Sequence, residues 1–257
     1  MKTRLGQELK IKLGMETEKE KKERVARERK ENEKLTEYFQ KIQNKKKPEL
    51  SKLTTAQFKN IFWSEGQKYF DKMNRDFVID KSNKTFLNLI CQYFAGDIAF
   101  EKSTNGELRK GLLIYGPCGT GKSSVFDIIQ NICKQYNLMQ FWFTNISVHE
   151  VVSEFNVETN KNKSLGGEAI IQKYSKGKVH FDDLGTEKQV QAWGIKENLF
   201  DNILQLRYNE FKTKGTKTFV TTNLSIKEIE KKYCKQVKDR LYEMFNFIEL
   251  TGNSRRF

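Results

Sequence analysis

The sequence has no run of 18 consecutive apolar residues, and its first eight residues contain no apolar stretch. The first absence predicts that the chain has no transmembrane helix, and the second that it has no secretory signal. The four cysteines, Cys91, Cys118, Cys133 and Cys234, are scattered without the spacing of a metal site. Isolated thiols of this kind are typical of a reducing compartment. We therefore expect a cytoplasmic protein that does not enter a membrane.

Acidic residues are fewer than basic ones, 33 against 47, which gives a net charge of +14. Residues 1–53 carry 17 basic and 10 acidic side chains, and Lys212 to Lys238 carries eight lysines against two glutamates. A lysine-rich segment is either a solvated surface or a face that contacts the phosphates of a nucleic acid. The sequence leaves both interpretations of the lysine-rich segment open.

The N-terminal part lacks the apolar stripe of a packed helix. Residues 16–34 are mostly charged, and Val25 is their only larger apolar side chain. Charges of opposite sign three and four residues apart favour an exposed helix, which gains an apolar face only from Leu35 to Ile42. A coiled coil is excluded because it needs apolar a and d positions throughout. We predict a charged helical extension over residues 1–47 and a more apolar helical segment over residues 48–110.

From Gly111 onward, apolar stretches of strand length alternate with stretches of helical periodicity. Such alternation is typical of an α/β domain with a parallel sheet, and no internal repeat is present. Strands are predicted at residues 111–116, 140–146, 178–183, 217–223 and 246–251. Helices are predicted at residues 122–136, 147–155, 166–175, 196–213 and 225–235, with a loop at 160–167.

The stretch Gly116-Pro-Cys-Gly-Thr-Gly-Lys122-Ser123 fits G-x-x-x-x-G-K-[ST], the phosphate-binding P-loop. Its glycines allow the backbone to turn N–H groups inward around an anion, and the following helix aims its free N–H groups at the same phosphates. The predicted strand before the loop and helix after it make an accidental match less probable. We expect Lys122 to contact the β- and γ-phosphates and Ser123 to ligate Mg²⁺. The predicted nucleotide-binding residues are Gly116, Pro117, Cys118, Gly119, Thr120, Gly121, Lys122, Ser123 and Ser124.

Two adjacent carboxylates end the predicted strand at residues 178–183. Alone, an apolar run that ends in two aspartates more often marks a turn, but after a P-loop it indicates the acidic half of an ATPase site. Asp182 is expected to hold Mg²⁺, and Asp183 to orient or deprotonate the attacking water. Two departures are visible: His180 takes a strand position that usually carries an aliphatic residue, and Asp183 stands where many such ATPases have glutamate. We therefore expect slow hydrolysis and unimpaired binding.

Two further polar residues complete the predicted catalytic set of Lys122, Asp183, Asn223 and Arg240. Asn223 ends a predicted strand, where its amide would hold the attacking water, although Thr-Thr-Asn is also an ordinary strand-to-turn ending. Arg240 lies in Lys238-Asp-Arg-Leu. Phosphoryl transfer often uses an arginine to stabilise transition-state charge, whereas a lone arginine otherwise pairs with a surface carboxylate. No arginine lies close to the P-loop in sequence, so one from a neighbouring subunit would couple hydrolysis to assembly.

Together, the motifs GPCGTGKS, HFDDLG, FVTTNL and DRL resemble the AAA+ ATPases of the helicase-loader group, which includes DnaC- and DnaI-type loaders and IstB-type transposition ATPases. The resemblance covers about Gly111 to Arg256. It implies an α/β, AAA+ type P-loop NTPase core with a five-stranded parallel sheet over residues 111–257, without a C-terminal lid and preceded by the α-helical extension. In this family Asn223 is sensor 1, and Arg240 matches the arginine finger that acts on a neighbour's ATP. The terminal Gly252-Asn-Ser-Arg-Arg256 is similar to the closing motif of the loaders.

The resemblance implies an ATPase that uses ATP and Mg²⁺, forms homo-oligomers on single-stranded DNA and delivers it to a replicative helicase. A second hypothesis is an IstB-like ATPase that assembles on duplex DNA and directs a transposase. A third is a scaffold that binds ATP without hydrolysing it. A small-molecule kinase fits poorly because no lid segment is visible between Asp183 and Lys217. The segment Phe77 to Lys84 precedes the P-loop at a place from which it would cover the base.

Overall fold

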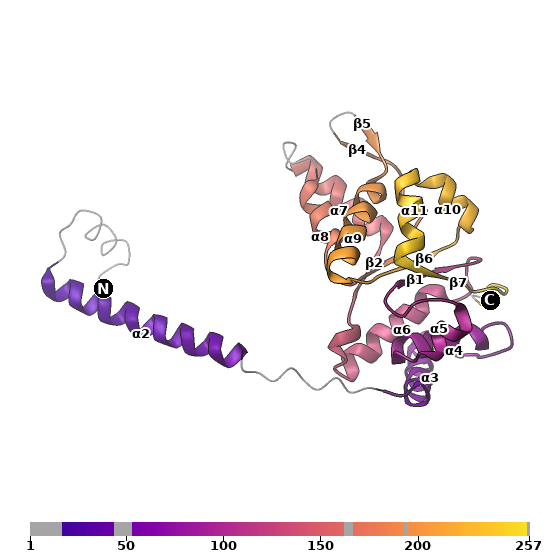
Figure 1. Cartoon of the computed structure of the whole chain (residues 1–257), viewed down its shortest axis with the longest axis horizontal. Helices are drawn as coiled ribbons and strands as arrows, with labels where there is room; N and C mark the ends of the chain where they lie inside the picture. The colour runs from indigo at the N-terminus through magenta and orange to yellow at the C-terminus, as the bar shows by residue number, and fades with distance from the viewer. Residues whose placement is uncertain (1–16, 44–52, 162–166, 193–194, 256–257) are drawn as a thin grey trace. The chain divides into compact units, whose positions relative to one another are not determined.

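The computed structural model describes residues 17–43, 53–161, 167–192 and 195–255 (Figure 1). The chain divides into two compact units, residues 1–50 and 51–257.

In the first unit, the described structure is one helix, α2 (Glu18–Gln43). Two glutamates lie in its first turn, where carboxylates stabilise the positive end of the helix dipole. Further along, Arg24 pairs with Glu28 one turn away, at 3.0 Å. Leu35 is half exposed, at 50%. The helical extension is therefore present as predicted, while most of the apolar face expected from Leu35 to Ile42 lies among side chains outside the described ones.

The second unit is built on a five-stranded parallel sheet with the order β2-β3-β6-β1-β7. Its strands are β1 (Gly111–Tyr115), β2 (Thr144–Ser147), β3 (Val179–Asp182), β6 (Thr218–Thr222) and β7 (Phe245–Glu249). The order places β1 between β6 and β7, and β6 between β1 and β3. The predicted five-stranded parallel sheet is confirmed.

Helices cover both faces of this sheet, as a parallel sheet requires. Successive residues of a strand point to opposite faces, so Leu113 packs in one apolar core and Leu112 and Ile114 pack in the other. The helices of the first core are α7 (Val148–Lys161), α8 (Glu168–Ser175), α9 (Leu199–Lys214), α10 (Ile226–Lys232) and α11 (Lys235–Met244). The helices of the second core are α3 (Thr55–Asp71), α4 (Lys84–Ala95), α5 (Ala99–Thr104) and α6 (Lys122–Gln135). Within the described ranges, no helix has the length and apolar character needed to cross a membrane.

Local sequence signals fix several helix ends. Thr54 and Gln57 form a capping box at the start of α3, in which each side chain accepts a hydrogen bond from the other's backbone N–H. Ser225 and Glu228 form the same arrangement at the start of α10. Helix α4 ends at Gly96, whose φ of 68° is the left-handed conformation that glycine adopts without strain. Gly96 therefore ends α4 inside the helical segment predicted over residues 48–110.

One region between β3 and α9 differs from the sequence prediction. An antiparallel hairpin of β4 (Val190–Ala192) and β5 (Ile195–Glu197) occupies it, where no strand is predicted. Helix α9, predicted from residue 196, begins instead at Leu199 because the Asn198 side chain caps it and accepts a hydrogen bond from the N–H of Phe200 at 3.2 Å. The strand predicted at residues 140–146 begins later in the chain, as β2 at Thr144, and ends at Ser147.

The helix predicted at residues 225–235 is α10, which ends earlier, at Lys232, and a further helix, α11, begins at Lys235 where no separate helix was predicted. Between them, Tyr233 is extended (φ −101°, ψ 155°) and buried at 4% exposure. The helix ends before Tyr233 because this ring is buried by tertiary packing, which helical periodicity in the sequence does not reveal. The second of the two helices, α11, carries Arg240.

Candidate active site

The glycine-rich loop follows β1 and ends where α6 begins at Lys122. Gly116, Gly119 and Gly121 have φ values of 146°, 82° and 100°, a region of the backbone map that favours glycine. A Cβ on Gly116 would lie 2.1 Å from the carbonyl oxygen of Leu250, so no larger residue fits there. The loop therefore has the backbone conformation and the helix N-terminus that suit a phosphate group.

The Lys122 ammonium is buried beneath this loop. Its Nζ donates to the carbonyl oxygens of Gly116 and Pro117, at 2.8 and 2.7 Å, and to Oδ1 of Asn223 at 2.8 Å. Asn223 directly follows β6, the strand that neighbours β1. The lysine thus connects the P-loop with the polar end of the adjacent strand.

Ser123 and Asp182 meet on the other side of the lysine. The Ser123 hydroxyl donates to Oδ1 of Asp182 at 2.7 Å, and the Thr221 hydroxyl donates to the same oxygen. Hydroxyl and carboxylate oxygens are the ligands that Mg²⁺ prefers, usually with one or two carboxylates, water and substrate phosphates completing the shell. These two residues therefore fit a Mg²⁺ ion shared with a nucleotide.

Asp183 lies at the end of β3 in an unusual backbone conformation. Its φ of 59° is left-handed, and its N–H donates to Oγ1 of Thr221 at 3.3 Å. The Asn223 Nδ2 donates to Oδ1 of Asp183 at 2.9 Å, while Asn223 Oδ1 accepts from Lys122. One amide thereby positions both a cation and a carboxylate. The structure thus brings Lys122, Ser123, Asp182, Asp183 and Asn223 close to one another.

These residues open on a cavity of about 620 Å³. Its polar lining includes Lys122, Asp183 and Asn223. Its apolar lining includes Phe77 and Val78 from the segment expected to cover the base. A cavity that combines polar groups at a P-loop with apolar side chains suits the phosphates and the base of a nucleotide.

The C-terminal tail also lines the cavity, which the sequence did not predict. The N–H of Arg255 donates to the carbonyl of Gly119 at 2.9 Å, and its guanidinium donates to Asp80 Oδ2 and Ser82 Oγ, each at 2.8 Å. The hydroxyl of Ser82 and then Arg255 hold the pKa of Asp80 at about 2. The one sequence signal for this contact is the terminal glycine-serine-arginine motif, whose last residue, Arg256, lies outside the described residues.

Arg240 is not part of this cavity. It lies on α11, where its guanidinium sits 4.9 Å from the ring centroid of Tyr208 on α9. Tyr208 in turn donates its hydroxyl hydrogen bond to Glu243 at 2.9 Å. The structure therefore separates Arg240 from the other predicted catalytic residues of the same chain.

His180, the unusual residue of β3, is fully buried. Its ring stacks on Phe126 with centroids 3.9 Å apart, and its Nδ1 lies 2.6 Å from Oδ1 of Asn145. Asn145 donates through Nδ2 to Asp127, also at 2.6 Å. Because an amide oxygen only accepts, Nδ1 of His180 carries the proton. Burial lowers the pKa of His180 to about 3, so the ring is neutral in the folded protein.

A P-loop after β1, aspartates at and directly after the end of β3, and a polar amide after the intervening strand β6 define the site. The protein is an α/β domain of the P-loop type, with helices on both faces of a five-stranded parallel sheet.

The sequence matches no protein-family model and no curated protein. Among solved structures, it is similar to the DnaC helicase loader (17% identity, TM-score 0.49), over 74% of this chain and 98% of that chain. It is similar to a protein described as a primosome component from Streptococcus pyogenes serotype M3 (19%, TM-score 0.44), over 70% of this chain and 85% of that chain. It is also similar to DnaI (22%, TM-score 0.42), over 55% of this chain and 73% of that chain.

Proposed function

We propose that this protein binds and hydrolyses ATP and uses the cycle to load a replicative helicase on single-stranded DNA. The observation that carries the ATPase part is that Lys122, Ser123, Asp183 and Asn223 line one cavity, while Ser123 also bonds Asp182. Each of these groups has a place in phosphoryl transfer, which depends on positioning and on charge stabilisation. The task of a loader is suggested by the resemblance of the motifs.

Each residue of the site has its own role in the proposed hydrolysis of ATP. Lys122, together with the loop N–H groups, binds the β- and γ-phosphates. Ser123 and Asp182 ligate Mg²⁺, which neutralises phosphate charge when bound. Asp183 accepts a proton from, or orients, the attacking water, and Asn223 holds Asp183 in place through the bond at 2.9 Å. Asp183 is one methylene shorter than glutamate, which is consistent with slow turnover.

The proposed function places Arg240 at a neighbouring subunit's ATP. Arg240 lies apart from the cavity of its own chain, so its action on a phosphate requires a second copy. ATP bound between two copies would then join assembly to hydrolysis. The proposed assembly is a homo-oligomer that forms in the presence of ATP.

For DNA contact, we propose the lysines of α10. Lys227 and Lys231 are exposed and lie four residues apart on this helix, so they share one face. Lys214 of the same lysine-rich segment is already engaged, since it pairs with Glu210 at 2.9 Å. Contact through lysine ammonium groups predicts binding that depends on salt and little on sequence.

The test measures ATP turnover without DNA, with single-stranded DNA and with duplex DNA, while the mass of the assembly is followed. Turnover and assembly stimulated by single strands support the loader. Assembly on duplex DNA favours the IstB-like alternative, and ATP binding without turnover favours the scaffold. The Lys122→Ala variant is the control, because loss of the phosphate-binding ammonium removes turnover that belongs to this site.

A further inference from the structure

A buried carboxylate stands behind the turn that carries Asp183. The Glu187 side chain is only 1% exposed. Its Oε2 accepts from the N–H of Gly185 at 2.6 Å, and its Oε1 accepts from the hydroxyl of Tyr233 at 2.6 Å. A buried carboxylate is costly unless its oxygens are satisfied, so these bonds fix the geometry on both sides. One side is the turn after β3, and the other is the junction of α10 and α11.

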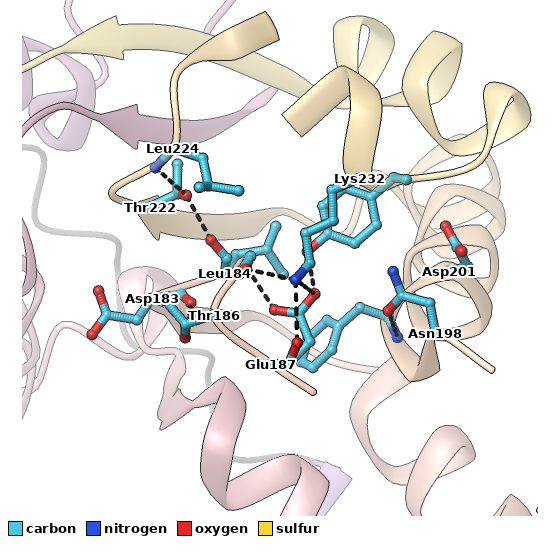
Figure 2. Close-up of polar contacts among 12 residues, drawn as sticks. Asp183, Leu184, Thr186, Glu187, Asn198, Asp201, Thr222, Leu224 and Lys232 are labelled. Atoms are coloured by element: carbon cyan, nitrogen blue, oxygen red, sulfur yellow. Dashed lines mark hydrogen bonds and ion pairs between the residues drawn. The ribbon is translucent and has the colours of Figure 1, made fainter. Parts of the chain in front are cut away.

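Lys232 makes a second connection between the same two places. Its Nζ donates to the carbonyl of Gly185 at 2.6 Å and to the carbonyl of Glu187 at 3.2 Å, and it lies 3.6 Å from the Glu187 carboxylate. Figure 2 shows Lys232 reaching toward Glu187, while the Asp183 side chain points away from both. The last residue of α10 is thus tied to the backbone of the turn itself.

The turn is held firmly between Asp183 and this contact. Thr186 donates its N–H and its hydroxyl to the carbonyl of Asp183, at 3.2 and 2.7 Å. The Thr222 hydroxyl donates to the carbonyl of Leu184 at 2.6 Å (Figure 2). A displacement at Gly185 or Glu187 therefore reaches Asp183 through a short, hydrogen-bonded turn. Asp183 already has a left-handed φ, a conformation that its surroundings must maintain.

The opposite end of the contact leads to Arg240. Helix α11 starts directly after Tyr233 and Cys234, and the N–H of Cys234 donates to Oδ1 of Asp201 at 3.1 Å. The first turn of α11 is therefore anchored by Glu187 through Tyr233 and by Asp201. Because an α-helix moves as a rigid element, a shift of Arg240 on α11 is felt at this anchor.

We propose that Glu187 and Lys232 are positioning residues that join the Asp183 turn to α11, so that the placement of Arg240 and the orientation of Asp183 change together. When Arg240 of one subunit contacts the nucleotide of its neighbour, the orientation of Asp183 in the subunit that carries the arginine would then change. The inference rests on the proposed function, in which Asp183 acts on the attacking water. It adds a route by which neighbouring ATP sites influence each other.

The test uses the full-length chain with the variants Glu187→Gln, Lys232→Met and Arg240→Ala, and the two double variants with Arg240→Ala. Steady-state turnover gives kcat and KM, and equilibrium titration with a fluorescent ATP analogue gives Kd. Lys188→Met is the matched control, because Lys188 is the exposed residue next to Glu187. Circular dichroism verifies folding, and Glu187→Gln, which is nearly isosteric, serves if Lys232→Met does not fold.

We expect Glu187→Gln and Lys232→Met each to lower kcat about fivefold, the size typical of changes along a coupling route, with KM and Kd unchanged. In the Arg240→Ala background the same changes should have no further effect on kcat, since the connection then has nothing to transmit. An equal loss of kcat in both backgrounds, or no loss in either, would overturn the inference.

The failure of the proposed function can be recognised separately. If the wild type binds ATP without turnover, that function fails, and amide hydrogen exchange over residues 226–244 decides the inference instead. A change in exchange on addition of AMPPCP that disappears in Lys232→Met supports the connection, and a change that persists overturns it. If the wild type binds no nucleotide, the proposed function and the inference both fail.

Discussion

His180 is an ionisable residue inside the sheet, and its environment makes stability depend on pH. Burial lowers its pKa from 6.5 to about 3. Between these two values the unfolded chain binds a proton that the folded chain does not, so stability is lost as pH falls below about 6.5 and continues to be lost down to about 3. His180 therefore makes the protein more stable at neutral than at mildly acidic pH.

We expect the wild type to lose about 2 kcal/mol of unfolding free energy through His180 between pH 7 and pH 5. Urea unfolding of the wild type and of His180→Leu at both pH values measures this effect. The variant is less stable at pH 7, since Asn145 loses its partner, but it lacks this pH dependence. Parallel pH profiles for the two proteins would contradict the assigned charge state.

Among single residues, the motifs predicted the polar groups Lys122, Asp183 and Asn223 better than the contact between Arg255 and Asp80 beside the cavity. Lys122, Asp183 and Asn223 lie on loops and strand ends whose register a parallel sheet fixes, so their spacing in sequence was enough. Arg255 and Asp80 are 175 positions apart, and they meet because the chain after β7 returns across the P-loop. No local pattern encodes such a return.

At the scale of elements, the C-terminal tail after β7 and the loop around Asp80 together close one side of the cavity. We expect Arg255→Ala to release nucleotide about threefold faster, because exposed ion pairs contribute little individually. Displacement of a fluorescent ATP analogue in a stopped-flow instrument gives the rate. Arg109→Ala removes a comparable exposed pair with Glu107 outside the cavity and should leave the rate unchanged. Equal rates for both variants would show that the tail does not retain nucleotide.

Helix α10 gives the second prediction at this scale. We expect Lys227→Ala with Lys231→Ala to weaken binding of single-stranded DNA and to make the salt slope, log K against log[salt], less negative by about 1.4, since each phosphate contact contributes about 0.7. Fluorescence anisotropy at several salt concentrations measures both quantities. Lys214→Ala is the control, as Lys214 pairs with Glu210 within α9. An unchanged slope would place the DNA on another surface.

The elements also show where periodicity stops being informative. Strand β1 before the P-loop and helix α6 after it follow from apolar patterns, because β1 is a short run buried on both faces and α6 has one buried face at helical spacing. The break between α10 and α11 follows from burial of Tyr233 against Glu187, a contact between residues 46 positions apart. The hairpin β4–β5 has strands of three residues each, which is too short for alternation to be recognised.

At the scale of the whole molecule, the cavity and Arg240 are separate features of one chain. Lys122 and Asp183 line the cavity, whereas Arg240 lies on α11 against Tyr208. In the proposed assembly, a head-to-tail contact between identical copies would bring the arginine of one to the cavity of the next. This arrangement predicts the activity that a mixture of two impaired variants should recover.

Arg240→Ala should keep only a small, measurable fraction of DNA-stimulated turnover and Lys122→Ala none, yet their equimolar mixture should recover about a quarter of wild-type activity, the share of contacts that pair an intact cavity with an intact arginine. A coupled assay for ADP, run across mixing ratios, measures the recovery. Lys122→Ala mixed with Asp183→Asn is the matched control, because both changes lie in the same cavity and no subunit of that mixture has an intact one. Recovery in neither mixture would mean that Arg240 acts within its own chain or not at all. Recovery only in the mixture of Arg240→Ala with Lys122→Ala would establish that ATP is hydrolysed between two copies.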